Sequence, residues 1–366
     1  MLFRAASLLA AALASPLALA QNPSTSTTAT APSPASASST TAASTFSPLP
    51  YPALDTLPAA VPGWDAKFNK GIPNIPVNAA QLPTPVWTKY QRQCISPGNW
   101  AVTFDDGPSD PTLALLDELK KRNIKVTFFV VGSRVIQNPA ILKRAFSEGH
   151  QIALHTWSHP ALTTGPTSQI IAEMMFSARA IKETIGVTPK YMRPPYGDID
   201  DRVGAILQAL GLTVVIWSYD SGDSANATDV AARFANLTVG PKVGQITLEH
   251  DLFAPEASQG PAAVDAVVAG GYKVVRIDEC LGGAAYDESI WSGFALDGSL
   301  GPFVNTANLS QPPPAAAPAP AGAVPSPGLT GAGPGTAKGA GNDAAGTTVS
   351  AFLALVSLAV AAAAML

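Results

Sequence analysis

Short apolar runs alternate with helix-like segments along the middle of this chain, and this alternation restricts its fold more than any other feature. The runs have strand length: Trp100–Phe104, Val126–Val131, Gln151–Leu154, Lys190–Arg193, Thr213–Trp217, Gln245–Glu249 and Lys273–Ile277. The segments between them carry apolar residues at helical spacing: Thr112–Arg122, Pro139–Ser147, Ser168–Ile185, Asp200–Leu210, Asp229–Phe234 and Ala262–Ala269. A strand–helix–strand series favours a parallel α/β arrangement, either an open sheet or a TIM-like barrel.

Polar side chains stand where these predicted strands end. They are Asp105 and Asp106, His155, Arg193, Asp220 and His250. In parallel α/β folds the carboxyl ends of the strands open onto one common mouth, where ligands bind. We therefore expect these side chains to form one functional site.

A metal centre is the first chemistry that they suggest. His155 and His159 are four residues apart, so both imidazoles can face one point. With the carboxylate of Asp106 they would form a three-ligand set with open positions, which is typical of a catalytic rather than a structural metal site. A divalent ion there would lower the pKa of water to about 7 and polarise a carbonyl.

Proton transfer is the second chemistry that these residues suggest. Asp105, beside the metal ligand, would act as general base, and the guanidinium of Arg193 would orient it. His250 would donate a proton to the leaving group, and Asp220 would keep that imidazole charged. The amide of Tyr196, the first N–H after two prolines, would point at a developing oxyanion.

Five ordered motifs resemble the NodB-type polysaccharide deacetylases, carbohydrate esterase family 4. They are TFDDGP (Thr103–Pro108), HTWSHP (His155–Pro160), RPPYGD (Arg193–Asp198), DSGD (Asp220–Asp223) and ITLEHD (Ile246–Asp251). The resemblance implies a distorted (β/α)7 TIM-like barrel and the residue roles given above. It also implies that Leu248 lines a pocket for an acetyl group.

The resemblance further implies Zn²⁺ as the metal, with Co²⁺ as the alternative, and hydrolysis of N-acetyl groups on a sugar polymer. Together with the sequence flanks, it resembles fungal chitin deacetylases of the cell surface, which would release acetate from chitin and leave chitosan. Two alternatives stay open: a deacetylase of another acetylated glycan, such as xylan or a peptidoglycan-like polymer, and a wall-binding homologue with weak catalysis.

The fourth motif departs from the family pattern. The family usually has a Trp where this chain has Ser224, and that indole would wall the sugar site. Trp217 and Trp157 are the candidates to replace it.

The two ends of the chain have the composition of processing signals and linkers. We expect a signal peptide over 1–20, a Ser/Thr/Ala/Pro-rich stalk over 21–48, and an irregular lead-in over 49–93 that packs its aromatics on the domain. The deacetylase domain would span 94–305, followed by a Pro/Ala/Gly-rich linker over 306–342.

The apolar run Ala351–Leu366 has no Lys or Arg behind it. With the small residues upstream, this is the pattern of a GPI-attachment signal, so 343–366 would be a propeptide and Asn342 the attachment residue. A tail-anchor helix is the alternative. We expect a secreted monomer on the outer face of the cell membrane, with the cell wall as the other location.

Charge and cysteine content add three expectations. The formal net charge of −4, with 13% charged residues, gives no basic footprint for nucleic acid. Cys94 and Cys280 suit one disulfide in an oxidising compartment, which would stabilise the fold by about 5 kcal/mol on the chain-entropy model; two unpaired thiols are the alternative. N-glycosylation sequons begin at Asn226, Asn236 and Asn308.

Overall fold

The computed structural model of the chain describes residues 49–82 and 89–293. The signal peptide, stalk, linker and GPI signal expected from the sequence therefore lie outside the described residues. Asn308 and Asn342 also lie outside them.

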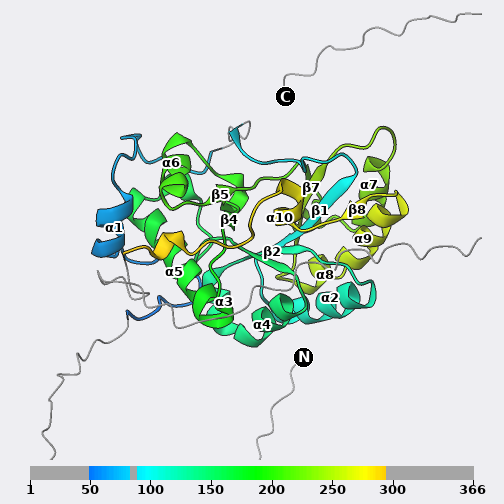
Figure 1. Ribbon diagram of the computed structural model, residues 1–366, viewed down its shortest axis with the longest axis horizontal. Helices are drawn as coiled ribbons and strands as arrows, with labels where there is room; N and C mark the ends of the chain where they lie inside the picture. Colours follow the sequence, from blue (N-terminus) through cyan, green and yellow to red (C-terminus); the bar gives the residue numbers. More distant parts are fainter. Residues whose placement is uncertain (1–48, 83–88, 294–366) are drawn as a thin grey trace, which may run out of the picture.

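A parallel sheet forms the centre of the protein, as the strand–helix alternation predicts (Figure 1). Its neighbours follow the order β5-β4-β3-β2-β1-β7-β6, and β8 also pairs with β1. The strands are β1 (Asn99–Asp105), β2 (Thr127–Val130), β3 (Gln151–Leu154), β4 (Tyr191–Met192), β5 (Thr213–Val214), β6 (Tyr219–Asp220), β7 (Gln245–His250) and β8 (Lys273–Val274). The sheet curls into a half-barrel, which agrees with the expected distorted (β/α)7 barrel. The sequence did not predict β6, because two residues without an apolar run leave no periodic signal.

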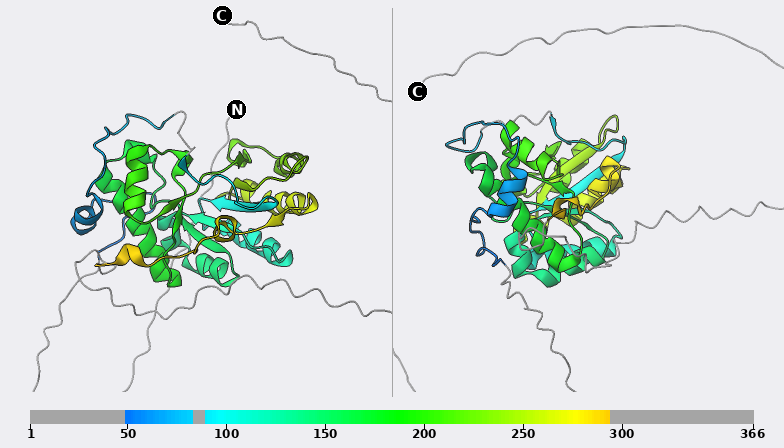
Figure 2. Two further views of the ribbon diagram at one scale, coloured as in Figure 1. Left: turned by 45° about the horizontal axis from the view of Figure 1, so that its top comes forward. Right: turned by 60° about the vertical axis from the view of Figure 1, so that its left-hand side comes forward.

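Helices cover the outside of this curved sheet (Figure 2). The predicted helices are present as α2 (Asp110–Lys121), α4 (Pro139–Ser147), α5 (Thr167–Ile185), α6 (Asp201–Ala209), α7 (Val230–Leu237) and α9 (Gly260–Ala269). Four short helices were not predicted: α1 (Pro62–Phe68), α3 (Gly132–Gln137), α8 (Ala254–Ala257) and α10 (Ile277–Leu281). None of the helices in 49–82 and 89–293 is long and apolar enough to cross a membrane.

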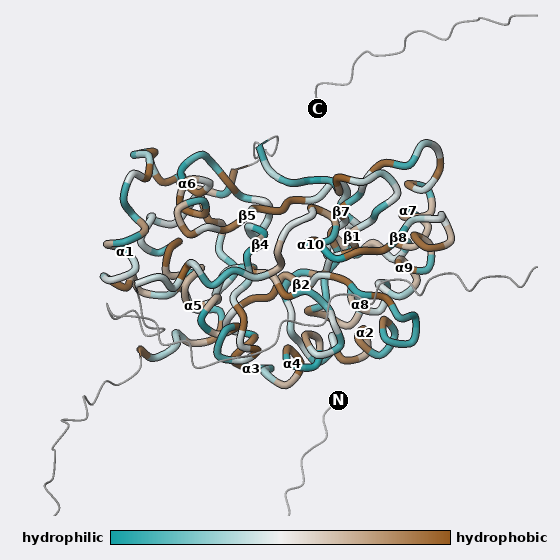
Figure 3. The backbone as a smooth tube through the Cα atoms, viewed as in Figure 1, coloured by the Kyte–Doolittle hydropathy of each residue, from teal (hydrophilic) through white to brown (hydrophobic). Residues whose placement is uncertain are grey.

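The two faces of the sheet bury separate apolar clusters, because successive side chains of a strand point to opposite faces. On β1, Trp100 and Phe104 belong to the large cluster beneath the helices. Ala101 belongs instead to a smaller cluster with Phe129 and Ile246, which lies inside the curl. Figure 3 shows apolar residues concentrated on the central strands, while the helices alternate between apolar and polar residues. This packing fixes the positions of the strand ends, where the polar motifs lie.

Two contacts join the ends of the described region to the sheet. Cys94 and Cys280, separated by 186 positions, form a disulfide bond. The lead-in packs an aromatic on the domain, as expected: Trp64 of α1 is fully buried and makes an edge-to-face contact with Phe176 of α5.

Candidate metal centre and active site

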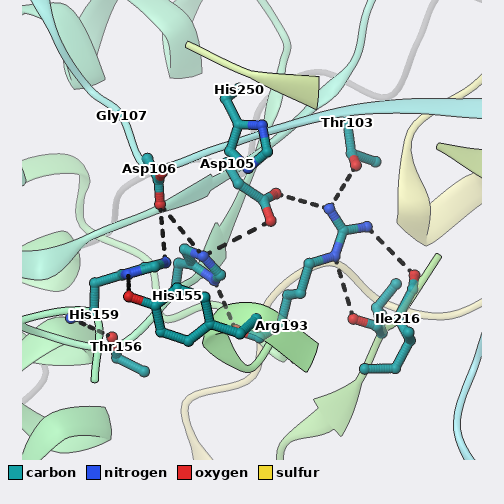
Figure 4. Close-up of polar contacts among 12 residues, drawn as sticks. Thr103, Asp105, Asp106, Gly107, His155, Thr156, His159, Arg193, Ile216 and His250 are labelled. Atoms are coloured by element: carbon teal, nitrogen blue, oxygen red, sulfur yellow. Dashed lines mark hydrogen bonds and ion pairs between the residues drawn. The ribbon is translucent and has the colours of Figure 1, made fainter. Parts of the chain in front are cut away.

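Five of the six polar residues predicted at the strand ends meet at one mouth, whereas Asp220, at the end of β6, is exposed (Figure 4). Asp105 ends β1 and pairs in register with His250, which ends β7. His155 and Arg193 each follow the last residue of a strand, β3 and β4 respectively. The carboxyl ends of these strands therefore bring distant parts of the sequence to one place.

Asp106, His155 and His159 form a cluster with the geometry of a metal site. One oxygen or nitrogen from each lies within 4.8 Å of the others. The Nε2 atoms of His155 and His159 lie 3.5 and 3.2 Å from Asp106 Oδ1. Oδ1 is buried and has no hydrogen-bond partner among the described residues.

The protonation of His155 shows that this cluster suits a cation. Its Nδ1 lies 2.7 Å from the carbonyl oxygen of Arg193, and since a carbonyl only accepts, Nδ1 carries the proton. Burial lowers the pKa of His155 well below its usual value, so the ring is neutral and Nε2 presents a lone pair. Burial also lowers the pKa of His159, although the charge of Asp106 opposes this. Lone pairs and a carboxylate oxygen that converge on one point, with no donor between them, fit a divalent metal.

The loop that carries both histidines is held from behind by Glu173 of α5. Thr156 and His159 have φ values of 68° and 60°, in the left-handed region that non-glycine residues rarely adopt. Glu173, fully buried, accepts hydrogen bonds from the amides of Trp157 and Ser158 at 2.7 and 2.9 Å. It also accepts one from Ser158 Oγ at 2.6 Å. These bonds to charged oxygens hold the loop in its strained conformation. No motif in the sequence points to Glu173; its one signal is a charged residue between the apolar Ala172 and Met174.

Asp105 forms a buried ion pair with Arg193, as predicted. Arg193 is fully buried and donates to Asp105 Oδ1 at 2.7 Å and to Thr103 Oγ1 at 2.7 Å. Burial raises the pKa of Asp105 to about 7, while the charge of Arg193 pulls it down. The second oxygen, Oδ2, lies 3.7 Å from His155 Nε2, on the side of the metal cluster. One carboxylate oxygen is thus fixed and the other faces the site.

The partner of His250 is Asp223, and the prediction of Asp220 was wrong. Asp223 Oδ1 lies 2.7 Å from His250 Nδ1, and its Oδ2 accepts from the His250 amide at 2.7 Å. Burial alone would lower the pKa of His250, but the hydrogen bond and charge of Asp223 outweigh it and raise the pKa to about 10. Asp220 is exposed and accepts a hydrogen bond from the amide of Gly222. The short turn after β6 directs Asp223 inward and leaves Asp220 at the surface.

Tyr196 lies at the edge of the same cluster. Its φ of 60° is left-handed, and its amide donates to no other described residue, so the N–H is available to a ligand. Its hydroxyl lies 3.1 Å from His159 Nδ1. The phenol thus contacts a predicted metal ligand, which the sequence analysis did not anticipate.

The predicted substrate-contacting residues differ in exposure. Leu248 of β7 is 5% exposed and Trp217 is 8% exposed, with its ring 5.6 Å from the guanidinium carbon of Arg193. Trp157 stacks on Tyr51 within the hydrophobic core, so it cannot take the place of an indole at the mouth. Ser224 is exposed and its small side chain leaves that part of the rim without a wall.

Asp251 supports the turn after Asp106, and two glycosylation sequons lie at the surface. Asp251, which the sequence analysis missed as a site residue, is fully buried and accepts from the amide of Gly107 at 2.9 Å and from Thr112 Oγ1 at 2.6 Å. It therefore ties the turn after Asp106 to the strand end that carries His250. The sequons at Asn226 and Asn236 both lie on exposed residues; their glycosylation stays a prediction.

Residues 92–215 match the polysaccharide deacetylase family. Chitin deacetylase 1 of Cryptococcus neoformans var. grubii is 38% identical over 275 residues, which cover 63% of this chain and 58% of that protein. The chitin deacetylase of Amylomyces rouxii is 41% identical over 172 residues, 44% of this chain and 41% of that one. The chain thus spans about half the length of these curated relatives.

One solved structure is matched over nearly its whole length. The chitin deacetylase from the fungal pathogen Colletotrichum lindemuthianum superposes with a TM-score of 0.52 at 32% identity, covering 56% of this chain and 97% of that one. The agreement of fold and sequence over nearly all of that protein, together with the family match, shows that this chain belongs to the polysaccharide deacetylase family.

Proposed function

We propose that this protein is a metal-dependent chitin deacetylase, which hydrolyses the N-acetyl groups of chitin to give chitosan and acetate. One observation carries the proposal: the Asp106–His155–His159 cluster lies at the same mouth as the Asp105–Arg193 and His250–Asp223 pairs. That arrangement supplies a cation site, a carboxylate base and an imidazolium acid, which are the groups that hydrolysis of an unreactive amide needs.

Asp106, His155 and His159 would hold the metal, and we propose Zn²⁺ with Co²⁺ as the alternative. A divalent cation, when bound, lowers the pKa of water to about 7 and polarises the acetyl carbonyl. The proton transfers and the hydrogen bond to the oxyanion come from the protein's own groups. Asp105 Oδ2, the carboxylate oxygen that Arg193 leaves available, faces the residues that would hold the metal.

Two proton transfers complete the hydrolysis. Asp105 accepts a proton from the water that adds to the acetyl carbon, and Arg193 holds the carboxylate for that transfer. The amide of Tyr196 donates to the oxyanion; a donor of this type lowers the barrier by about 3–4 kcal/mol. His250, kept charged by Asp223, then donates a proton to the nitrogen as the C–N bond breaks, releasing acetate and the free amine.

The location of the protein remains a proposal from its sequence. A signal peptide, a GPI signal with attachment at Asn342, and sequons at Asn226, Asn236 and Asn308 together support a secreted, membrane-anchored protein, and we propose that it acts as a monomer. It would reside on the outer face of the cell membrane or in the wall, where chitin is accessible.

The test of this function is acetate release from N-acetylglucosamine oligomers and from acetylated xylan, with and without a chelator. We expect release from the oligomers that the chelator abolishes and added Zn²⁺ restores. Release from xylan alone would overturn the chitin assignment in favour of the other acetylated glycan. No release from either substrate by folded, metal-loaded protein would leave a wall-binding role.

Replacing Glu173→Gln is expected to weaken metal binding by about 10–100-fold, because groups that orient metal ligands commonly have effects of that size. The amide oxygen can still accept from both backbone N–H groups, but it lacks the negative charge that strengthens these bonds, and the NH₂ group in place of Oε1 no longer accepts from Ser158 Oγ. The measurement is the Zn²⁺ dissociation constant by competition with a chromogenic chelator.

Glu183→Gln is the matched control, since Glu183 lies on the same helix but bonds to Arg179 and Tyr51 instead of the amides of the histidine loop. Tyr51 reaches that loop only by stacking on Trp157, a contact that the substitution leaves in place. Its metal affinity should equal that of the wild type. An unchanged dissociation constant in folded Glu173→Gln protein would show that the loop keeps its conformation without the carboxylate.

A further inference from the structure

The lead-in, drawn in blue in Figure 1, contacts two loops of the active site. The amide of Leu82 donates to Asp198 at 2.9 Å, in the loop that follows β4. Tyr51 stacks on Trp157 of the histidine loop, with the ring centroids 5.3 Å apart. The match to the family begins at residue 92, so both of these lead-in residues lie outside it. A part of the chain that precedes the family match therefore adjoins the active site.

A third contact of the lead-in leads to the predicted metal ligand Asp106 through Arg134 of α3. Asp55 Oδ2 forms an ion pair with Arg134 Nη2 at 3.4 Å. Asp55 also accepts from Ser133 Oγ at 3.2 Å, and its amide donates to the same oxygen at 3.3 Å. Arg134 Nη1 donates to the main-chain carbonyl oxygen of Asp106 at 2.9 Å. One guanidinium thus joins the lead-in to a metal ligand.

We infer that Arg134 is a positioning residue for Asp106, and that Asp55 of the lead-in holds Arg134 in place for this task. The inference rests on the proposed function, because a bound metal needs the Asp106 carboxylate in a fixed position. Asp106 has a φ of 81°, in the left-handed region that a non-glycine residue adopts when its surroundings hold it there. Its amide donates to the carbonyl oxygen of Phe129 at 3.1 Å, and its own carbonyl accepts from Arg134. The peptide groups on both sides of the strained residue are therefore held.

The guanidinium of Arg134 suits this task because it is planar and carries several donors at fixed angles. Its side chain is 15% exposed, whereas that of Asp55 is 45% exposed, so the ion pair itself is weak and mainly directs the guanidinium toward the carbonyl. The start of α3 is also fixed, since the amides of Gly132 and Ser133 donate to carbonyl oxygens of the histidine loop at 2.9 and 3.1 Å. Arg134 therefore extends from the turn that contacts the loop of the other two ligands.

The experiment compares Arg134→Met, which removes the donors but keeps an unbranched side chain, with Arg122→Met. Arg122 is the matched control, because its guanidinium pairs with Asp265 and Glu118 instead of a loop of the active site. Arg134→Lys, Asp55→Asn and the double variant with Arg134→Met and Asp55→Asn complete the set. Two properties of each folded protein are measured. They are the Zn²⁺ dissociation constant, by competition with a chromogenic chelator, and the visible spectrum of the Co²⁺-loaded protein, which depends on the ligand geometry.

We expect Arg134→Met to weaken Zn²⁺ binding by about tenfold or more and to alter the Co²⁺ spectrum, as for other groups that orient metal ligands. Arg134→Lys should recover most of the loss, since an ammonium can still donate to the carbonyl. Asp55→Asn should weaken binding by about threefold, because an exposed ion pair contributes little. It should have no further effect in Arg134→Met protein, because the two side chains act as one unit. Both properties of Arg122→Met should match the wild type.

An unchanged dissociation constant and spectrum in Arg134→Met, or equal losses in Arg134→Met and Arg122→Met, would overturn the role of Arg134. No effect of Asp55→Asn, or the same effect with and without Arg134, would overturn the link to the lead-in. If Arg134→Met does not fold, Arg134→Lys and Asp55→Asn still decide, since wild-type values in both would overturn the inference. A wild-type protein that binds no Zn²⁺ would refute the proposed function as well, whereas failure of the inference alone leaves the wild-type affinity intact.

Discussion

Asp105→Asn is expected to lower kcat by about 10²–10⁴-fold while the protein still binds its metal. The amide cannot accept a proton, but its oxygen can still accept the hydrogen bond from Arg193 that now goes to Asp105 Oδ1. The metal cluster would keep all three of its ligands, since Asp105 is not among them. Steady-state kinetics and metal content by atomic absorption measure the two effects on the same preparation.

The same substitution should also cost stability, because Arg193 is fully buried and would lose its counter-charge. Breaking a buried ion pair from one side typically costs about 3–5 kcal/mol. Circular dichroism must therefore show a native fold before the kinetics are interpreted.

His159→Ala provides the contrast, since it removes a proposed ligand and should lose both metal and turnover. A wild-type kcat in Asp105→Asn would show that another group accepts the proton. Loss of metal from Asp105→Asn would instead assign Asp105 to the metal cluster.

The residues that the sequence located correctly share one property: each lies at or just after the end of a strand. Apolar runs can be recognised locally, so the positions after Phe104, Leu154 and Met192 follow directly from them. Parallel topology then brings those positions together without knowledge of any side-chain contact. The strand ends therefore locate four site residues from the sequence: Asp105, Asp106, His155 and Arg193. The structure brings all four to one mouth.

What the sequence could not decide depends on the path of a turn or on contact between distant elements. Asp220 and Asp223 belong to the same motif, and residue type alone does not distinguish them. Gly222 adopts a φ of 75°, and that turn directs the second aspartate toward His250. Glu173 reaches the histidine loop from a helix, so no local pattern links the two. Trp157, beside a metal ligand in sequence, faces the core instead of the mouth.

Asp223→Asn is expected to move the alkaline limb of the pH–rate profile to lower pH, by several pH units. Asp223 holds the pKa of His250 at about 10, above the usual 6.5, so the imidazole stays protonated as the pH rises toward 10. A neutral amide removes the charge that opposes desolvation, so the pKa should fall to its usual value or below. At pH 8 this would leave on the order of one thirtieth of His250 in the acid form. The measurement is kcat against pH from 6 to 11 for both proteins.

Asp220→Asn is the matched control, because it makes the same chemical change within the same motif at a residue that is exposed and does not contact His250. Its alkaline limb should coincide with that of the wild type. If Asp220→Asn moved the limb and Asp223→Asn did not, the original assignment from the motif would stand. If neither moved it, a group other than His250 would protonate the leaving amine.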